Sequence, residues 1–163
     1  MTNAEKELEK DYERYMLIAH EEGSKSLREG NNGFGAVIVI LKNGEIVAKT
    51  HDTENTASDP TSHAEINAIR IASKKLGKDL SECILVSTHE PCPMCSTALI
   101  WAKIQGIVYS VSIKEALKLG RTRIDLTCEE LIERANATIW VKKGVLKEKC
   151  ITLYKSKRDK KPF

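Results

Sequence analysis

Two short motifs in this chain combine residue types that bind metal ions. Cys92 and Cys95 lie three residues apart and directly follow Pro91. In the first turn of a helix, side chains at positions i and i+3 point the same way, and the positive end of the helix favours the thiolates that a metal ion needs. The pair is therefore predicted to offer two sulfur ligands to one metal ion.

His63 is predicted to supply a third ligand from the first turn of a second helix. The two helices begin at the same edge of the sheet if the segments before them run side by side. Histidine and cysteine are ligands that zinc prefers, and a zinc ion with three protein ligands keeps its fourth position for water. Glu65, two residues after His63, is placed to accept the proton of that water. The sequence thus predicts a hydrolytic zinc site with Glu65 as its catalytic residue.

Each motif has a simpler explanation when it is taken alone. A histidine at a helix start usually caps or packs, a glutamate beside it usually faces solvent, and a Cys-x-x-Cys pair serves redox chemistry as readily as metal binding. A redox pair needs no His-x-Glu at a second helix start, and this chain has one. The combination favours the open zinc site, with one zinc ion per subunit.

The segments around the motifs alternate between predicted helices and strands. Asn43-Gly44 predicts a hairpin between two antiparallel strands, and a strand, a helix and a strand around Cys92 predict a parallel crossover. The expected fold is α/β, a three-layer α/β/α sandwich with a five-stranded mixed sheet and helices on both faces, in one domain over residues 1–163. The predicted helices are 5–29, 59–76, 91–105, 113–119, 127–135 and 147–158, and the predicted strands are 34–41, 45–50, 83–88, 107–111 and 137–145.

The composition narrows the class of protein. The 163 residues carry a net charge of +3 from 26 basic and 23 acidic residues, a balance too even to indicate nucleic-acid binding by itself. No window approaches the ~20 apolar residues of a membrane helix, and the charged start is unlike a secretory signal, so a cytoplasmic protein without membrane contact is expected. Cys83, Cys128 and Cys150 are predicted to be buried rather than paired in disulfides.

The two motifs resemble the signature of the cytidine deaminase-like superfamily, H-x-E followed by P-C-x-x-C. Residues 59–65, DPTSHAE, resemble a run shared by bacterial guanine deaminases and tRNA adenosine deaminases, and residues 90–95 have the form EPCPMC. The resemblance covers roughly residues 8–145. It implies zinc-dependent hydrolytic deamination of a nucleobase or nucleoside, with release of ammonia.

Within the superfamily, the chain looks most like the guanine deaminase branch. Phe34 before Gly35, residues 83–85, Pro93 and Trp101 carry that likeness. Residues 114–120, KEALKLG, do not match the K-T-G-A-A-G-S run that is usual in the tRNA-editing branch. The likeness implies a small-molecule substrate, guanine or a related aminated purine or heterocycle. The alternatives are a tRNA adenosine-to-inosine deaminase, a cytosine or cytidine deaminase, and a zinc-folded interaction module without catalysis.

The expected substrate contacts include one departure from the family pattern. Both branches have an asparagine seven residues before the aspartate of D-P-T, where this chain has Asp52. An ionised carboxylate only accepts hydrogen bonds, so Asp52 is expected to favour a ring N–H, an amino group or a sugar hydroxyl over a carbonyl. Alternatively, a loop shift brings Asn55 to this contact.

Several further residues are predicted to contact the substrate, and three of them have an alternative role. Phe34 is expected to stack on the base or to pack in the core, and His89 to line the pocket or to lie in a loop. Asp125 is expected to accept from a ligand amine or to cap a helix. Ala64 and Pro91, inside the two motifs, complete this group.

The end of the chain resembles the basic, aromatic tail of the guanine deaminase branch. In that branch the tail is exchanged between subunits, which implies a homodimer in which the helix and tail over 147–163 cross over and Phe163 caps a neighbour's site. The alternative is a frayed, solvated terminus. The basic residues between 155 and 161 are predicted to be a solvated helix end, so nucleic acid is not the favoured partner.

Overall fold

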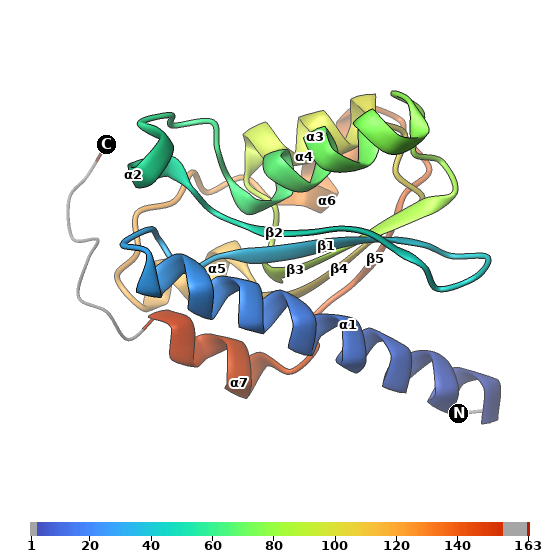
Figure 1. The fold of residues 1–163 in the computed structure, drawn as a ribbon, viewed down its shortest axis with the longest axis horizontal. Coiled ribbons are helices and arrows are strands. Elements are labelled where there is room, and N and C mark those ends of the chain that lie inside the picture. Colours follow the sequence, from blue (N-terminus) through green and yellow to red (C-terminus); the bar gives the residue numbers. More distant parts are fainter. Residues whose placement is uncertain (1–2, 155–162) are drawn as a thin grey trace.

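The computed structural model describes residues 3–154 and Phe163. It contains a five-stranded sheet between two layers of helices (Figure 1), which confirms the predicted three-layer α/β/α fold. β1 is antiparallel to both β2 and β3, whereas β3, β4 and β5 run parallel. The strands, in their order across the sheet, are β2 (Ile46–His51), β1 (Gly35–Ile40), β3 (Cys83–His89), β4 (Gly106–Val111) and β5 (Trp140–Lys142).

Each face of the sheet carries its own apolar core. Helices α1 (Asn3–Arg28) and α7 (Lys147–Cys150) cover one face, and α3 (Ala64–Leu76), α4 (Pro93–Trp101) and α6 (Cys128–Arg134) cover the other (Figure 1). Successive side chains of a strand point to opposite faces. Val37 of β1 therefore packs with Met16 of α1, while Ile38 packs in the core that contains Ala68 of α3 and Leu99 of α4.

The close approach of α1 to β1 depends on Gly35. A Cβ atom at this position would lie 1.8 Å from the carbonyl oxygen of Ala19 in α1. Only glycine lets the helix backbone pack this tightly against the start of the strand. The contact places the end of α1 and residues 30–34 beside the carboxyl end of β3.

The predicted starts of the two helices that carry the motifs are wrong, and both helices begin later in the sequence than expected. α3 begins at Ala64 rather than at 59, because Asp59 accepts hydrogen bonds from the backbone N–H and hydroxyl of Thr61 and forms a turn of its own. α4 begins at Pro93 rather than at 91, with Cys92 as its N-cap residue, and ends at Trp101. Gly106, predicted to stop this helix, begins β4 instead.

Other predicted boundaries also change. The predicted loop at 51–58 contains a short helix, α2 (Glu54–Ala57), and the strand predicted over 137–145 is reduced to Trp140–Lys142. The last predicted helix is α7 followed by a 3₁₀ turn (Ile151–Tyr154), and residues 155–158 lie outside the described part of the chain.

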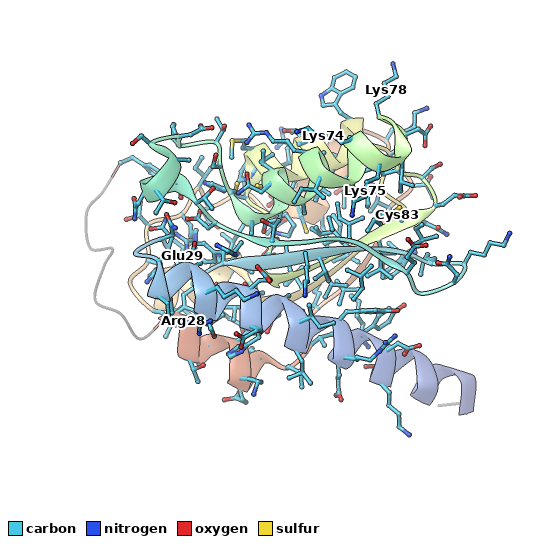
Figure 2. The ribbon with its side chains drawn as sticks, in the orientation of Figure 1. Arg28, Glu29, Lys74, Lys75, Lys78 and Cys83 are labelled. Atoms are coloured by element: carbon cyan, nitrogen blue, oxygen red, sulfur yellow. The ribbon has the colours of Figure 1, made fainter. Side chains whose placement is uncertain are left out.

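The remaining elements agree well with expectation. α5 (Ile113–Lys118) and α6 both begin with capping boxes, and Thr127 is the N-cap residue that was predicted for α6. Cys83, which begins β3 in Figure 2, is buried and unpaired, as are Cys128 and Cys150. None of the helices in the described residues combines the length and the apolar character needed to cross a membrane.

Candidate metal and catalytic site

Three predicted ligands converge at the carboxyl end of β3. His63 immediately precedes α3, Cys92 immediately precedes α4, and Cys95 lies in the first turn of α4. The sulfur atoms of Cys92 and Cys95 lie 3.5 and 3.6 Å from His63 Nδ1. The helix starts that were misplaced by the sequence prediction thus still deliver the three ligands to one point.

The geometry and chemistry of this trio fit zinc. Zinc binds sulfur at about 2.3 Å and imidazole nitrogen at about 2.0–2.1 Å, so a tetrahedral site separates the two ligand atoms by roughly 3.6 Å. The observed sulfur–nitrogen distances match that separation. A second group, Asp52, Glu54 and His63, also places ligand-type atoms within 4.8 Å of one another, but it shares His63 with the first.

The charges of the trio suit a cation. A hydrogen bond from Cys95 and another from His63 outweigh burial and lower the pKa of Cys92 to about 4, whereas the same Cys92 contact and burial raise the pKa of Cys95. Burial opposes protonation of His63, but contacts with Cys92 and Glu54 raise its pKa to about 11. These shifts describe a Cys92 thiolate beside a protonated His63, and a metal ion bound there would take the place of the imidazole proton.

Glu65 lies directly beside this trio. Its side chain is buried, Oε1 accepts a hydrogen bond from the Ser87 hydroxyl at 2.8 Å, and Oε2 lies 3.5 Å from the sulfur of Cys95. Burial, followed by the negative charge of Cys92, raises the pKa of Glu65. A carboxyl whose pKa is moved toward neutrality can both accept and return a proton, which is what a general acid and base requires.

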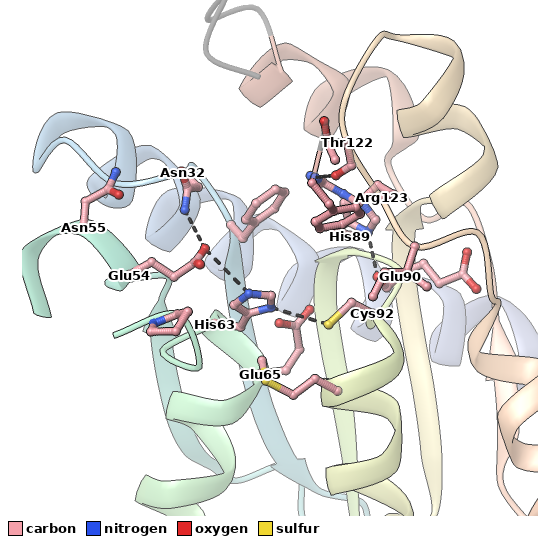
Figure 3. Close-up of a pocket in the computed structure, with 15 residues that line it drawn as sticks. Asn32, Glu54, Asn55, His63, Glu65, His89, Glu90, Cys92, Thr122 and Arg123 are labelled. Atoms are coloured by element: carbon pink, nitrogen blue, oxygen red, sulfur yellow. Dashed lines mark hydrogen bonds and ion pairs between the residues drawn. The ribbon is translucent and has the colours of Figure 1, made fainter. Parts of the chain in front are cut away.

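A cavity of about 500 Å³ opens onto His63, Glu65 and Cys92 (Figure 3). This volume is within the range of small-molecule sites. Among the described residues that line it, the ionisable side chains other than Cys92 are three glutamates, two histidines and one arginine. This described part of the wall is therefore not the cationic surface that a phosphate backbone requires.

Asp52 does not line this cavity among the residues described. Its side chain is fully buried, and Oδ1 accepts hydrogen bonds from the side chain of Asn32 and from the backbone N–H of Glu54. Burial, followed by the neighbouring Glu54 carboxylate, raises the pKa of Asp52 to about 7. Glu54, Asn32 and Asn55 line the cavity instead. The substrate contact predicted for Asp52 thus has no direct path in this structure.

The alternative prediction, that Asn55 makes the substrate contact in place of Asp52, agrees with the structure only in part. Asn55 lines the cavity, but its Nδ2 donates to the carbonyl oxygen of Gly30 at 2.8 Å and so supports the loop. Sequence reasoning missed Glu54 and Asn32, although the turn at 30–33 and the polar run after β2 were the signals that could have indicated them.

His89 and Phe34 both line the cavity, as predicted. Their rings meet edge to face with centroids 5.4 Å apart, and Phe34 also packs against the core. His89 donates from Nδ1 to the carbonyl oxygen of Glu90 and accepts at Nε2 from Arg123. Burial, followed by the charge of Arg123, lowers the pKa of His89 to about 3, so its ring is neutral. Arg123 is a cavity residue that no sequence motif indicated.

The other predicted contacts are placed differently. Ala64 and Pro91 are buried and are not among the described residues that line the cavity. Asp125 is exposed and pairs with Lys114 at 2.6 Å, so it neither faces the cavity nor caps a helix. Phe163 is 89% exposed and lies at the cavity of its own chain.

A basic cluster lies away from the cavity. Lys74 and Lys75 lie in the last turn of α3 and Lys78 follows the end of that helix (Figure 2), whereas His63 precedes its first residue. Cations at this position complement the negative end of the helix dipole. Their location gives them a structural explanation that requires no nucleic acid.

Comparison with known proteins agrees with the site. Residues 9–111 match the family described as the cytidine and deoxycytidylate deaminase zinc-binding region. Guanine deaminase from Bacillus subtilis is 46% identical over 88 residues, 53% of this chain and 55% of that protein, so the match spans about half of the relative's length. A tRNA-specific adenosine deaminase from Bacillus subtilis is 37% identical over 139 residues, 85% of this chain and 83% of that protein.

The fold agrees as well. The structure resembles that of guanine deaminase from Nitrosomonas europaea with a TM-score of 0.77 over 87% of this chain and 81% of that one, at 24% sequence identity. The family match and the His63, Cys92 and Cys95 trio confirm the prediction of zinc as the metal. From its motifs, its fold and its sequence relatives, the chain belongs to the cytidine and deoxycytidylate deaminase zinc-binding family.

Proposed function

We propose that the protein is a hydrolytic deaminase of a small nucleobase or nucleoside, most simply guanine or a related aminated heterocycle. The observation that carries this proposal is the buried Glu65 carboxylate beside a zinc-type trio at the base of a cavity. In the reaction, water adds to the amine-bearing carbon and ammonia leaves. The carbon–nitrogen bond is thereby replaced by a carbon–oxygen bond, with no change of oxidation state.

His63, Cys92 and Cys95 are the residues that would hold the metal. When bound there, zinc acidifies water and stabilises negative charge on oxygen. Glu65 accepts the proton of the attacking water and returns protons to the ring nitrogen and to the departing amine. Ser87 holds Glu65 in place through its hydroxyl, at 2.8 Å. Phe34 and the neutral His89 supply apolar and aromatic surface for the ring of the base.

A tRNA adenosine deaminase is the second candidate, because the tRNA-specific relative aligns with more of this chain than the guanine deaminase does. The charge of the described cavity residues favours the small-molecule candidate, since they include three glutamates and one arginine. RNA binding would produce a steep loss of affinity with salt through phosphate contacts.

An ammonia-release assay with the zinc-loaded protein separates the candidates. It should compare guanine, guanosine, adenine, cytosine, their nucleosides and amino-triazines with a tRNA substrate. Turnover of a free base or nucleoside is the expected result. Activity on tRNA with no turnover of any small heterocycle would reverse the ranking.

The assembly is also part of the proposal. We expect a homodimer in which the tail that ends at Phe163 caps the cavity of the partner subunit, whereas within the single chain Phe163 lines the cavity of its own chain. Light scattering after size-exclusion chromatography measures the mass directly. A monomer at the concentrations that support full activity would contradict the dimer.

A further inference from the structure

One wall of the cavity is built from acceptor atoms. Glu54 begins α2 and lines the cavity beside Asn32. Its side chain is 26% exposed, Oε2 accepts a hydrogen bond from Asn32 Nδ2 at 2.6 Å, and the same oxygen lies 3.6 Å from His63 Nε2. A carboxylate has about four acceptor positions, so Glu54 keeps positions for a ligand beyond its hydrogen bond from Asn32 and its ion pair with His63.

Asn32 can offer a ligand only its carbonyl oxygen. Its Nδ2 donates to Asp52 Oδ1 at 3.1 Å as well as to Glu54 Oε2, and these two bonds use both amide hydrogens. Glu54 and Asn32 together form what we call the oxygen wall. It can accept hydrogen bonds from a ligand but has no hydrogen to donate.

The oxygen wall is held rigidly from behind. The buried side chain of Asn31 accepts hydrogen bonds from the backbone N–H groups of Asn55 and Thr56, each at 3.0 Å, and so supports the start of α2. Asp52 accepts from the backbone N–H of Glu54 at 3.3 Å. A binding group that is supported in this way discriminates between ligands because it cannot turn away from an unsuitable one.

The position of the wall indicates which part of a substrate it meets. Figure 3 shows the imidazole of His63 between Glu54 on one side and Cys92 on the other. The sulfurs of Cys92 and Cys95 face Nδ1 and Glu54 faces Nε2, so the wall and the two cysteines lie at opposite sides of this ring. A heterocycle whose reacting carbon lies beside Glu65 therefore presents its remote edge to the wall.

We propose that Glu54, together with Asn32, selects aminated heterocycles that carry an amino group or ring N–H on the edge remote from the reacting carbon. A carbonyl on that edge would face acceptors alone and lose its hydrogen bonds with water without replacement. This inference rests on the proposed function, and it moves to Glu54 the selectivity that the sequence suggested for Asp52. Within the aminated heterocycles of the proposed function, a diamino-type compound therefore fits this wall better than guanine does.

Guanine and 2,6-diaminopurine test this inference, because they share the C2 amine and differ in the neighbouring pair of groups: guanine has a carbonyl at C6 and a hydrogen on N1, whereas 2,6-diaminopurine has an amino group at C6 and no hydrogen on N1. Their dissociation constants should be measured by calorimetry on zinc-loaded protein carrying Glu65→Gln, which prevents turnover, with and without Glu54→Gln. Asp52→Asn in the same background is the matched control, since it replaces a carboxyl directly behind the wall. Zinc content is measured for every variant, and ammonia release by the wild-type protein is followed in parallel.

The expected result is tighter binding of 2,6-diaminopurine, by about tenfold or more, with Glu54→Gln removing that preference and Asp52→Asn retaining it. Equal weakening of both compounds by Glu54→Gln, loss of zinc in that variant, or a preference that responds to Asp52→Asn instead would overturn the inference. Turnover by the wild-type protein without a preference for 2,6-diaminopurine would overturn the inference about Glu54 and leave the proposed function intact. Selective binding of 2,6-diaminopurine without turnover would support the inference and contradict the proposed function. If the wild-type protein bound neither compound, both proposals would be rejected.

Discussion

At the scale of single residues, the site is defined by contrasting environments of similar side chains. Glu65 is buried beside two sulfurs and its pKa is raised, whereas contacts with His63 and Asp52 outweigh burial and lower the pKa of Glu54. Two carboxyl groups that line one cavity are thus suited to different roles. Glu65 fits proton transfer and Glu54 fits a permanent charge that binds hydrogen-bond donors.

The catalytic role proposed for Glu65 leads to a prediction about activity. Glu65→Gln should retain zinc, because Glu65 is not one of the three ligands, and should reduce kcat by about 10²–10⁴-fold through loss of proton transfer. Ammonia release and metal analysis of the same sample measure both properties. Glu133→Gln, an exposed change on α6, is the control. Full activity in Glu65→Gln would mean that another group moves the protons.

A histidine outside the cavity makes stability depend on pH. His51, at the end of β2, pairs with Glu22 through Nδ1 at 2.8 Å and with Glu29 through Nε2 at 2.7 Å. Burial opposes protonation, but the two carboxylates outweigh it and raise the pKa of His51. Such a histidine stabilises the fold fully below the pKa of the unfolded chain, about 6.5, and loses this contribution as pH rises through the folded pKa.

His51→Gln should therefore lower the free energy of unfolding more in acid than in alkali. We expect the loss at about pH 6 to exceed the loss at about pH 9 by about 1 kcal/mol. Urea denaturation of both proteins at the two pH values measures this difference. An equal loss at both values would show that the charge of His51 adds nothing to stability.

At the scale of elements, helix starts organise the carboxyl edge of the sheet. Glu90 follows β3 and is buried, and its two oxygens accept from the backbone N–H of Ile113 in α5 at 2.8 Å and of Cys128 in α6 at 2.9 Å. One carboxylate thus joins the first turns of two helices to the segment that carries Cys92. This bridge explains why a glutamate precedes the Pro-Cys motif in this chain.

The bridge by Glu90 can be tested by an isosteric change. Glu90→Gln should lower the free energy of unfolding by about 2 kcal/mol, because an amide group has one acceptor oxygen and leaves one buried N–H unpaired. Urea denaturation measures the loss, with the exposed Glu133→Gln as a control for the change in charge. If the two variants were equally stable, the bridge would not contribute to folding.

Gly35 carries a second prediction at this scale. Gly35→Ala should destabilise the protein by about 2–3 kcal/mol, because the added Cβ would meet the carbonyl oxygen of Ala19 and force α1 away from β1. Thermal denaturation measures the effect. Gly77→Ala tests a different effect, because Gly77 has a positive φ of 88° and open space around it, so that an added Cβ there strains the backbone and meets no neighbouring atom. A stable Gly35→Ala protein would mean that α1 moves without cost.

At the scale of the whole molecule, the metal trio joins two helices of one layer. His63 precedes α3 and the two cysteines lie at the start of α4. A bound ion would therefore link residues that are 29 and 32 positions apart in the sequence. Because the ion binds the folded chain, it shifts the folding equilibrium by mass action. Zinc is therefore expected to serve stability as well as chemistry.

Removal of zinc should be visible in thermal unfolding. A ligand present at about 1,000 times its dissociation constant contributes about 4 kcal/mol, which for a domain of this size corresponds to roughly 10 °C in Tm. Calorimetry before and after treatment with a chelator measures the shift, and restored zinc should reverse it. An unchanged Tm after verified loss of zinc would show that the fold does not depend on the ion.

The amino-acid sequence by itself determined the fold class, the hairpin at Asn43 and the metal trio with Glu65. These features depend on local signals: the alternation of apolar residues, a turn dipeptide, and ligand types at short spacings. A shift of several residues in a helix start does not change them, because His63 and the cysteines lie at the turn before or within the first turn in either case.

Only the tertiary structure decided which residues form the oxygen wall of the cavity. Asp52 is buried, and Glu54 takes its place at the cavity because Asn31 and Asn32, some twenty residues earlier, bind the turn after β2. The separations of 20 and 24 residues put these contacts beyond any periodic signal. Hydrogen bonds between distant polar side chains depend on how α1 and β1 pack, and that packing exists only once the sheet and its helices have come together.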